Sequence, residues 1–244
     1  MSGNTCKKAI AIIPARGGSK RIPGKNIKVL AGKPIISYTI LAAIRSGLFT
    51  QVVVSTDSHE IAKVSRQCGA DVPFIRDSQL ADDITPVSAV TADVLHRLDP
   101  ACKKFDAVAQ LMPNCPLRTA DDVIRSYEQF VQTSAQSQIS VVRYGWQNPW
   151  WAMRMNHNNE LHPVFKEAVS QRSQDLPELF CPTGAIWWAR AETLCRRKTF
   201  HIDNRTGWEI PWQRGIDIDT PEDWEMAEAL LSMSAVQIAN MAWP

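Results

Sequence analysis

AIAIIPARGGSKRIPGKN, residues 9–26, joins an apolar run directly to a basic loop that is rich in glycine and proline. The apolar run at 10–13 predicts a buried strand. Glycines let backbone N–H groups approach an anion closely, and the cations of the loop neutralise its charge. A basic turn exposed to solvent is the other interpretation. We favour a strand that leads into a phosphate-binding loop.

Positive charge is concentrated around this loop. Nine Lys and Arg residues lie within the first 56 positions, where no Asp or Glu occurs. The loop lacks the Walker A pattern, and Gly17 and Gly18 are adjacent, which does not fit the dinucleotide pattern G-x-G-x-x-G. We therefore expect neither a P-loop ATPase nor a Rossmann dehydrogenase.

Length and composition predict one globular domain over residues 1–244. The net charge of +2 disfavours nucleic-acid binding, and the apolar runs are too short for a membrane span. The N-terminus does not resemble a secretory signal, so we expect a cytoplasmic protein. Its six scattered cysteines then predict reduced thiols.

Apolar periodicity predicts that strands and helices alternate along the chain. This alternation indicates an α/β fold, a mostly parallel sheet with helices on both faces. Ligands of such sheets bind beyond the carboxyl ends of the strands, which places residues 16–26, Asp57 and residues 113–118 on one rim. The expected strands are 9–14, 51–55, 72–75, 106–112, 184–189 and 215–218, and the expected helices are 34–46, 59–68, 85–98, 121–131 and 221–231.

A pair of carboxylates forms the second chemical signal, in GIDIDT at residues 215–220. On a strand, Asp217 and Asp219 would point to the same face. Two carboxylates at a strand end suit Mg²⁺ with phosphate co-ligands. The alternative, that an Asp only caps the next helix, is less favoured because Thr220 can cap it alone.

All nine tryptophans follow residue 145. Residues 144–182 are irregular and rich in Trp, Pro and Asn, which predicts an inserted arm that serves as an interface. Trp187, Trp188 and Trp224 fit positions in the core equally well.

Five motifs occur in order along nearly the whole chain: PARGGSKRIPGKN, RDSQLADD, PNCPLR, RSQDLP–CPTGAIW and DIDTPEDW. Together they resemble the acylneuraminate cytidylyltransferase family, the CMP–sialic acid synthetases and their bacterial nonulosonate relatives. The resemblance implies a nucleotide-diphospho-sugar transferase (Rossmann-like) fold with an inserted dimerisation arm. It also implies that CTP and a nonulosonic sugar acid give CMP-sugar and diphosphate, with Mg²⁺, in a homodimer.

The resemblance also implies site residues. Arg16, Lys25 and Asp217 would be catalytic, Asp217 and Asp219 would bind the metal, and Arg172 and Thr183 would bind the sugar acid. Arg172 would act at the partner subunit's site. The residues expected to bind the nucleotide are Arg16, Gly17, Gly18, Ser19, Lys20, Lys25, Asn26 and Arg76.

Three departures from the family pattern lie where sugar and base are recognised, one of them in residues 84–88, where no serine aligns cleanly with the family's base-contacting one. Met112 stands where many sialate enzymes have Gln, and Thr183 stands where they often have Asn. The sequence therefore leaves the acid open among N-acetylneuraminate, pseudaminate, legionaminate and other nonulosonates. Two alternatives remain: a nucleotidyltransferase for 3-deoxy-manno-octulosonate or a sugar 1-phosphate, and a non-catalytic binding protein with a nucleotide fold.

Overall fold

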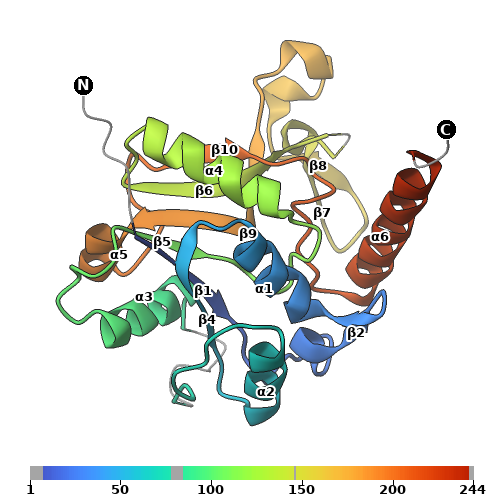
Figure 1. The fold of residues 1–244 in the computed structure, drawn as a ribbon. Helices are drawn as coiled ribbons and strands as arrows, with labels where there is room; N and C mark the ends of the chain where they lie inside the picture. The colour runs from blue at the N-terminus through green and yellow to red at the C-terminus, as the bar shows by residue number, and fades with distance from the viewer. Residues whose placement is uncertain (1–7, 78–84, 146, 242–244) are drawn as a thin grey trace.

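The computed structural model of the chain describes residues 8–77, 85–145 and 147–241. A six-stranded sheet in the order β10-β6-β9-β5-β1-β4 forms its centre (Figure 1). The strands are β1 (Ala9–Pro14), β4 (Phe49–Ser55), β5 (Ala107–Gln110), β6 (Ser137–Arg143), β9 (Phe180–Arg190) and β10 (Thr206–Glu209). The helices are α1 (Ile35–Arg45), α2 (His59–Gln67), α3 (Val87–Leu98), α4 (Ala120–Gln132), α5 (Ala191–Arg197) and α6 (Pro221–Met241). None of these helices is long and apolar enough to cross a bilayer.

The prediction of a mostly parallel sheet is confirmed. Strand β1 pairs in parallel with β4 and β5, and β10 pairs in parallel with β6. Strand β9 runs antiparallel between β5 and β6. The carboxyl ends of β1, β4 and β5 therefore meet at one edge of the sheet.

Both faces of the sheet are covered, because the side chains of β1 alternate between two apolar cores. Ala11 and Ile13 pack with α1, α2 and α4, whereas Ile10 and Ile12 pack with α3 and α5. All four side chains are fully buried. The continuous apolar run at 10–13 thus reflects a strand that is covered on both sides.

Two expected strands are wrong. Residues 72–75 form no strand: isolated bridges join Asp71 to Val53 of β4 and Ile75 to Thr56, and Pro73 between them has no N–H to donate. Residues 215–218 form no strand either, and the strand that pairs with β6 at the edge of the sheet is β10. Strands β6 and β10 were not expected.

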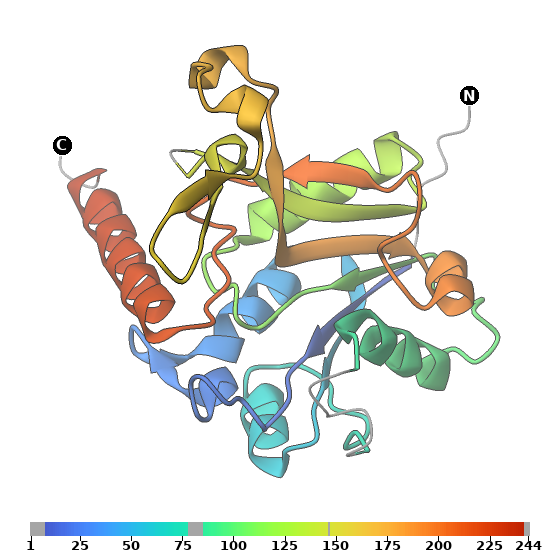
Figure 2. The ribbon, with the colours of Figure 1, turned by 180° about the vertical axis from the view of Figure 1, so that it is seen from behind.

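The segment between β6 and β9 leaves the sheet and projects beyond it (Figure 2). It contains the hairpin β7 (Met153–Met155) and β8 (Leu161–Pro163) and three single 3₁₀ turns (Pro149–Trp151, Lys166–Ala168 and Ser173–Asp175). The expected arm therefore begins at Tyr144, but it ends before Phe180 because residues 180–182 already belong to β9. Strands β2 (Val29–Leu30) and β3 (Lys33–Pro34) make a smaller hairpin before α1.

The tryptophans divide between core and arm. Trp188 is fully buried and stacks on Phe130, and Trp224 packs in a third apolar cluster with Ile22 and Leu30. Trp151 in the arm is 38% exposed. Trp146 lies outside the described residues.

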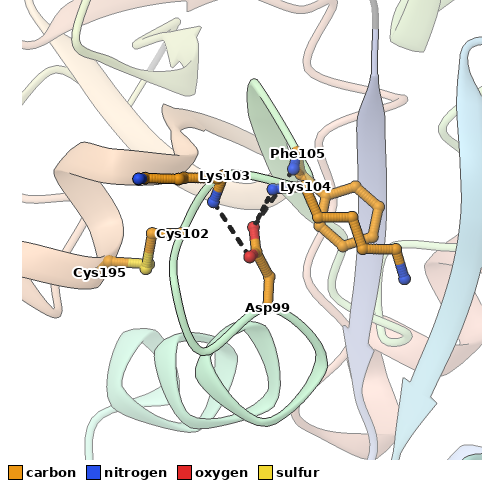
Figure 3. Close-up of a disulfide and its surroundings, with 6 residues drawn as sticks. All are labelled: Asp99, Cys102, Lys103, Lys104, Phe105 and Cys195. Carbon is orange, nitrogen blue, oxygen red and sulfur yellow. Dashed lines mark hydrogen bonds between the residues drawn. A yellow bond between two sulfur atoms is a disulfide. The ribbon is translucent and has the colours of Figure 1, made fainter.

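The prediction that all cysteines are reduced thiols is wrong for one pair. Cys102 and Cys195 form a disulfide between the turn after α3 and helix α5 (Figure 3). Asp99 fixes that turn by accepting the backbone N–H groups of Lys103 at 3.0 Å and Lys104 at 2.7 Å. In the sequence the two cysteines are 93 residues apart, a spacing that carries no local signal. Closing so long a loop stabilises a folded chain by about 4–5 kcal/mol in a chain-entropy model.

Candidate active site

A cavity of about 490 Å³ opens at the carboxyl ends of β1 and β5. The basic loop after β1 forms one side, and α3 and the turn after β5 form the other. The lining side chains that carry charge are Arg16, Lys20, Arg21, Lys25, Arg76 and Asp219. An excess of cations in a concave site suits a polyphosphate.

Two hydrogen bonds and one backbone conformation give the basic loop its shape. The backbone N–H of Gly17 donates to Asp57 Oδ1 at 2.8 Å. The buried amide of Asn26 donates to the carbonyl oxygen of Arg16 at 2.9 Å and closes the loop. Gly24 has a φ of 64°, a backbone conformation that glycine adopts readily. Asn26 thus positions Arg16 and also lines the cavity.

Asp219 lies within the cluster of cations. Lys25 Nζ contacts Asp219 Oδ1 at 2.9 Å and donates to the carbonyl oxygen of Ile218 at 2.7 Å. Arg21 contacts the other carboxylate oxygen at 3.0 Å. Partial burial alone would raise the pKa of Asp219, but the hydrogen bond and charge of Lys25, with those of Arg21, lower it. Asp219 is therefore ionised at neutral pH.

Asp217 has a different environment. Its carboxyl accepts the backbone N–H of Gly184 at 3.1 Å and the thiol of Cys115. Burial raises the pKa of Asp217, and the hydrogen bonds from Cys115 and Gly184 oppose that rise. Asp217 does not line the cavity, so the expectation that both carboxylates point to one face of a strand is wrong.

Arg76 is buried at the cavity wall. Its side chain is 4% exposed, and its Nη2 lies 3.7 Å from Asp57 Oδ1. Burial lowers the pKa of Arg76, and the charge of Asp57 opposes that change. Asp57 therefore links the cavity cation Arg76 to the loop at Gly17.

Arg118, which follows the turn after β5, holds the floor of the site together. Its buried guanidinium donates to the carbonyl oxygens of Ala185 and Met112 and to Thr39 Oγ1. Burial lowers the pKa of Arg118, and Cys115 and Asp217 oppose that change. Arg118 thus connects α1, β9 and the turn that carries Met112.

The structure brings most of the predicted residues together and separates a few. Gly17 and Gly18 shape the loop but do not line the cavity. Thr183 is buried in β9, and its hydroxyl contacts Ser140 Oγ at 3.0 Å. Arg172 is exposed in the arm and pairs with Asp175 at 2.7 Å. Most of the RDSQLADD motif, residues 78–83, lies outside the described residues. The predicted residues that do line the cavity are Arg16, Ser19, Lys20, Lys25, Asn26, Arg76 and Asp219.

Sequence reasoning missed part of the uncharged side of the cavity. Thr85, Val87 and Val90 reach the cavity from the start of α3, and Asn114 reaches it from the turn after β5. The helical spacing of Val87 and Val90 did not predict that they line the cavity, because residues of the core have the same spacing.

The donor set fits a magnesium ion that is shared with a substrate. Across residues 8–77, 85–145 and 147–241, no group of three or more His, Cys, Asp or Glu side chains is placed to hold a metal. Asp219 lies within the cation cluster, and Asp217 lies two residues before it on the same segment. Mg²⁺ commonly binds through one or two carboxylates, substrate phosphates and water.

Comparison with known proteins agrees with this geometry. A family model described as "Cytidylyltransferase" matches residues 10–102, which include nearly all of β1, the basic loop and the whole of α3. A pseudaminic acid cytidylyltransferase of Campylobacter jejuni is 34% identical over 93% of this chain and 97% of its own length. The chain belongs to the cytidylyltransferase family. It is therefore a nucleotidyltransferase enzyme.

Other relatives of this cytidylyltransferase act on related acids, as their names state. A CMP-N,N'-diacetyllegionaminic acid synthase of Legionella pneumophila is 34% identical over 93% of this chain and 97% of its own length. A solved structure of CMP:2-keto-3-deoxy-manno-octonic acid synthetase complexed with CTP aligns with a TM-score of 0.69 and 18% identity, covering 93% of this chain and 99% of that one. The solved structure supports the nucleotidyltransferase fold only.

Proposed function

We propose that this cytidylyltransferase transfers the cytidylyl group of CTP to a nonulosonic acid, giving CMP-sugar and diphosphate. The observation that carries the proposal is the cavity in which Arg16, Lys20 and Lys25 lie beside Asp219. That arrangement suits a triphosphate. The full-length similarity to cytidylyltransferases of pseudaminic and legionaminic acid supports the choice of acid.

Different residues of the cavity would bind the substrates and stabilise the charge that develops during the transfer. Arg16, Lys20 and Arg76 bind the phosphates, and Ser19 and Asn26 add polar contacts at the loop. As the anomeric hydroxyl of the acid attacks the α-phosphate and diphosphate leaves, negative charge grows on the phosphate oxygens. Lys25 stabilises that charge. Asp217, whose pKa is raised, would accept the proton of the attacking hydroxyl once its carboxyl turns from the backbone of Gly184 toward the cavity.

Asp217 and Asp219 are the residues that would hold Mg²⁺. When bound, Mg²⁺ supplies positive charge to the phosphates of CTP. Asp219 is ionised beside Lys25, and Asp217 would bind the ion in its deprotonated form. The fit of these two carboxylates to a hard cation is the basis of this proposal.

We also propose that the arm is the interface of a homodimer. Apolar side chains of the arm are exposed although they belong to a folded hairpin and its flanks, and Met155 and Leu161 are 65% and 62% exposed. A surface of this kind favours association. Arg172, exposed in the same arm, would then reach the acid at the partner subunit's site. Sedimentation velocity tests the interface, and a single monomeric species at micromolar concentration would exclude it.

Diphosphate release tests the reaction itself. With Mg²⁺ and a mixture of nonulosonic acids, we expect release with CTP and background rates with ATP, GTP and UTP. A second mixture holds 3-deoxy-manno-octulosonate and sugar 1-phosphates. Faster release with that second mixture would replace the proposed acid. No release with any triphosphate, together with no calorimetric binding of CTP–Mg²⁺, would favour the non-catalytic alternative.

A further inference from the structure

Asp57 does not line the cavity, but its carboxylate contacts two parts of the cavity wall. It follows β4 directly, after the fully buried Thr56. It precedes Ser58, whose hydroxyl caps α2 by accepting the backbone N–H of Ile61 at 3.3 Å. The backbone of Asp57 is therefore anchored by a strand of the sheet on one side and by a helix on the other. A carboxylate anchored in this way can fix the groups that contact it.

The first of these groups is the backbone of the basic loop. Gly17 donates its N–H to Asp57 Oδ1 at 2.8 Å. A Cβ added at Gly17 would lie 3.2 Å from Ser58 Cβ, so the loop packs directly on the turn that carries Asp57. Arg16, which lines the cavity, precedes Gly17 in the chain. The contact with Asp57 therefore also restrains the backbone of Arg16.

The second group is the guanidinium of Arg76. Its Nη2 lies 3.7 Å from the same oxygen, Asp57 Oδ1. The backbone N–H of Arg76 donates to the carbonyl oxygen of Thr56 at 2.8 Å, so this segment is also fastened to the end of β4. Among the residues that the structure describes, the buried Nε of Arg76 has no hydrogen-bond partner. Arg76 therefore keeps a donor for an anionic ligand while Asp57 contacts its Nη2.

The charge of Asp57 also offsets a repulsion between two cations. Burial is the largest cause that lowers the pKa of Arg76, the charge of Asp57 opposes it, and the charge of Arg16 lowers the pKa further. Arg16 and Arg76 line the same cavity, so each makes the charge of the other less favourable. A carboxylate that contacts Arg76 and accepts the N–H that follows Arg16 reduces this cost.

We propose that Asp57 is a positioning residue that holds Arg76 and the loop at Gly17 in the arrangement that binds the phosphates of CTP. The proposal rests on the proposed function. It predicts a change in affinity that is opposite in sign to the effect of charge alone. Removing a negative charge beside a cationic cavity should by itself tighten the binding of an anion, whereas losing a positioning contact should weaken it.

The experiment measures the affinity for CTP–Mg²⁺ by calorimetry in Asp57→Asn, Arg76→Ala and the double variant. Asparagine can still accept the N–H of Gly17, so Asp57→Asn removes mainly the charge that holds Arg76. The control is Asp93→Asn. Asp93 also places a negative charge near Arg76, but it pairs with Arg97 at 2.9 Å and does not line the cavity.

We expect Asp57→Asn to weaken the binding of CTP–Mg²⁺ by roughly tenfold, the lower end of the loss that follows removal of an outer partner of a metal ligand. In the Arg76→Ala background the same substitution should change the affinity by less than about twofold, because the group that Asp57 positions is gone. Asp93→Asn should bind CTP–Mg²⁺ as tightly as the unaltered enzyme, or more tightly.

Equal or tighter binding by Asp57→Asn would overturn the inference alone. So would an equal loss in Asp93→Asn, because the loss would then follow from charge without contact. A loss that persists in full in the Arg76→Ala background, or an Asp57→Asn protein without a cooperative thermal transition, would overturn it by making Asp57 a requirement of the fold. No binding of CTP–Mg²⁺ by the unaltered enzyme would overturn the proposed function and the inference with it.

Discussion

Replacing Asp217 with asparagine is expected to lower kcat by roughly 100-fold or more, the usual contribution of a positioned proton acceptor. Asparagine keeps the shape of the side chain and can still accept the backbone N–H of Gly184, but it loses the negative charge. Both proposed roles of Asp217, as metal ligand and as proton acceptor, require that charge. Initial rates of diphosphate release at several Mg²⁺ concentrations measure the effect.

We expect Asp217→Asn to lose activity without a decrease in its free energy of unfolding. Burial raises the pKa of Asp217, so the ionised carboxyl is less favourable in the folded chain than in the unfolded one. The stability that this group supports is present below its unfolded pKa and is lost as pH rises through its folded pKa. At neutral pH the neutral amide should therefore leave the free energy of unfolding unchanged or slightly higher. A protein that gains stability while losing activity has a functional group at that position.

An exposed carboxylate provides the control. Asp203→Asn removes the same charge at an exposed position that does not line the cavity, and it should retain the rate of the unaltered enzyme. Near-unaltered rates of Asp217→Asn at low Mg²⁺ would contradict the proposed role. Loss of activity together with a large drop in melting temperature would instead indicate a structural role.

The basic side of the cavity was predictable because its signals are local. A strand, a glycine-rich turn and several cations follow one another within residues 9–26, and the structure places Arg16, Lys20 and Lys25 at one cavity. The mostly parallel sheet was predictable for a similar reason, since helices alternate with buried strands over the first half of the chain.

Features that depend on distant partners were not predictable. Asp217 and Asp219 are two residues apart, and the pattern suggested one strand face. The segment forms no strand, however: the carboxyl of Asp217 contacts the backbone of Gly184, and that of Asp219 contacts Lys25. The disulfide likewise depends on the packing of α5 against the turn after α3. Neither arrangement leaves a signal in the spacing of the residues concerned.

Replacing Lys25 with alanine is expected to lower kcat/KM by an amount that corresponds to about 2–4 kcal/mol of transition-state stabilisation, as for the loss of one oxyanion donor. Lys25 Nζ is held by Asp219 and the carbonyl oxygen of Ile218, and its side chain is 15% exposed. An ammonium group fixed in this way is already oriented before charge develops on the phosphates. Most of the effect should appear in kcat, because the remaining cations still bind the triphosphate.

The control variant Lys28→Ala distinguishes the loss of the Lys25 contact from a general loss of positive charge. It is exposed, stacks over the ring of Trp224 at 4.6 Å and does not line the cavity. Lys28→Ala changes the net charge of the same segment by the same amount, so it should cost little activity. Similar losses in both variants would mean that long-range attraction of the triphosphate is the main contribution of the basic loop. A loss confined to Lys25→Ala, and still present at high salt where exposed charges are screened, would assign the contribution to the contact itself.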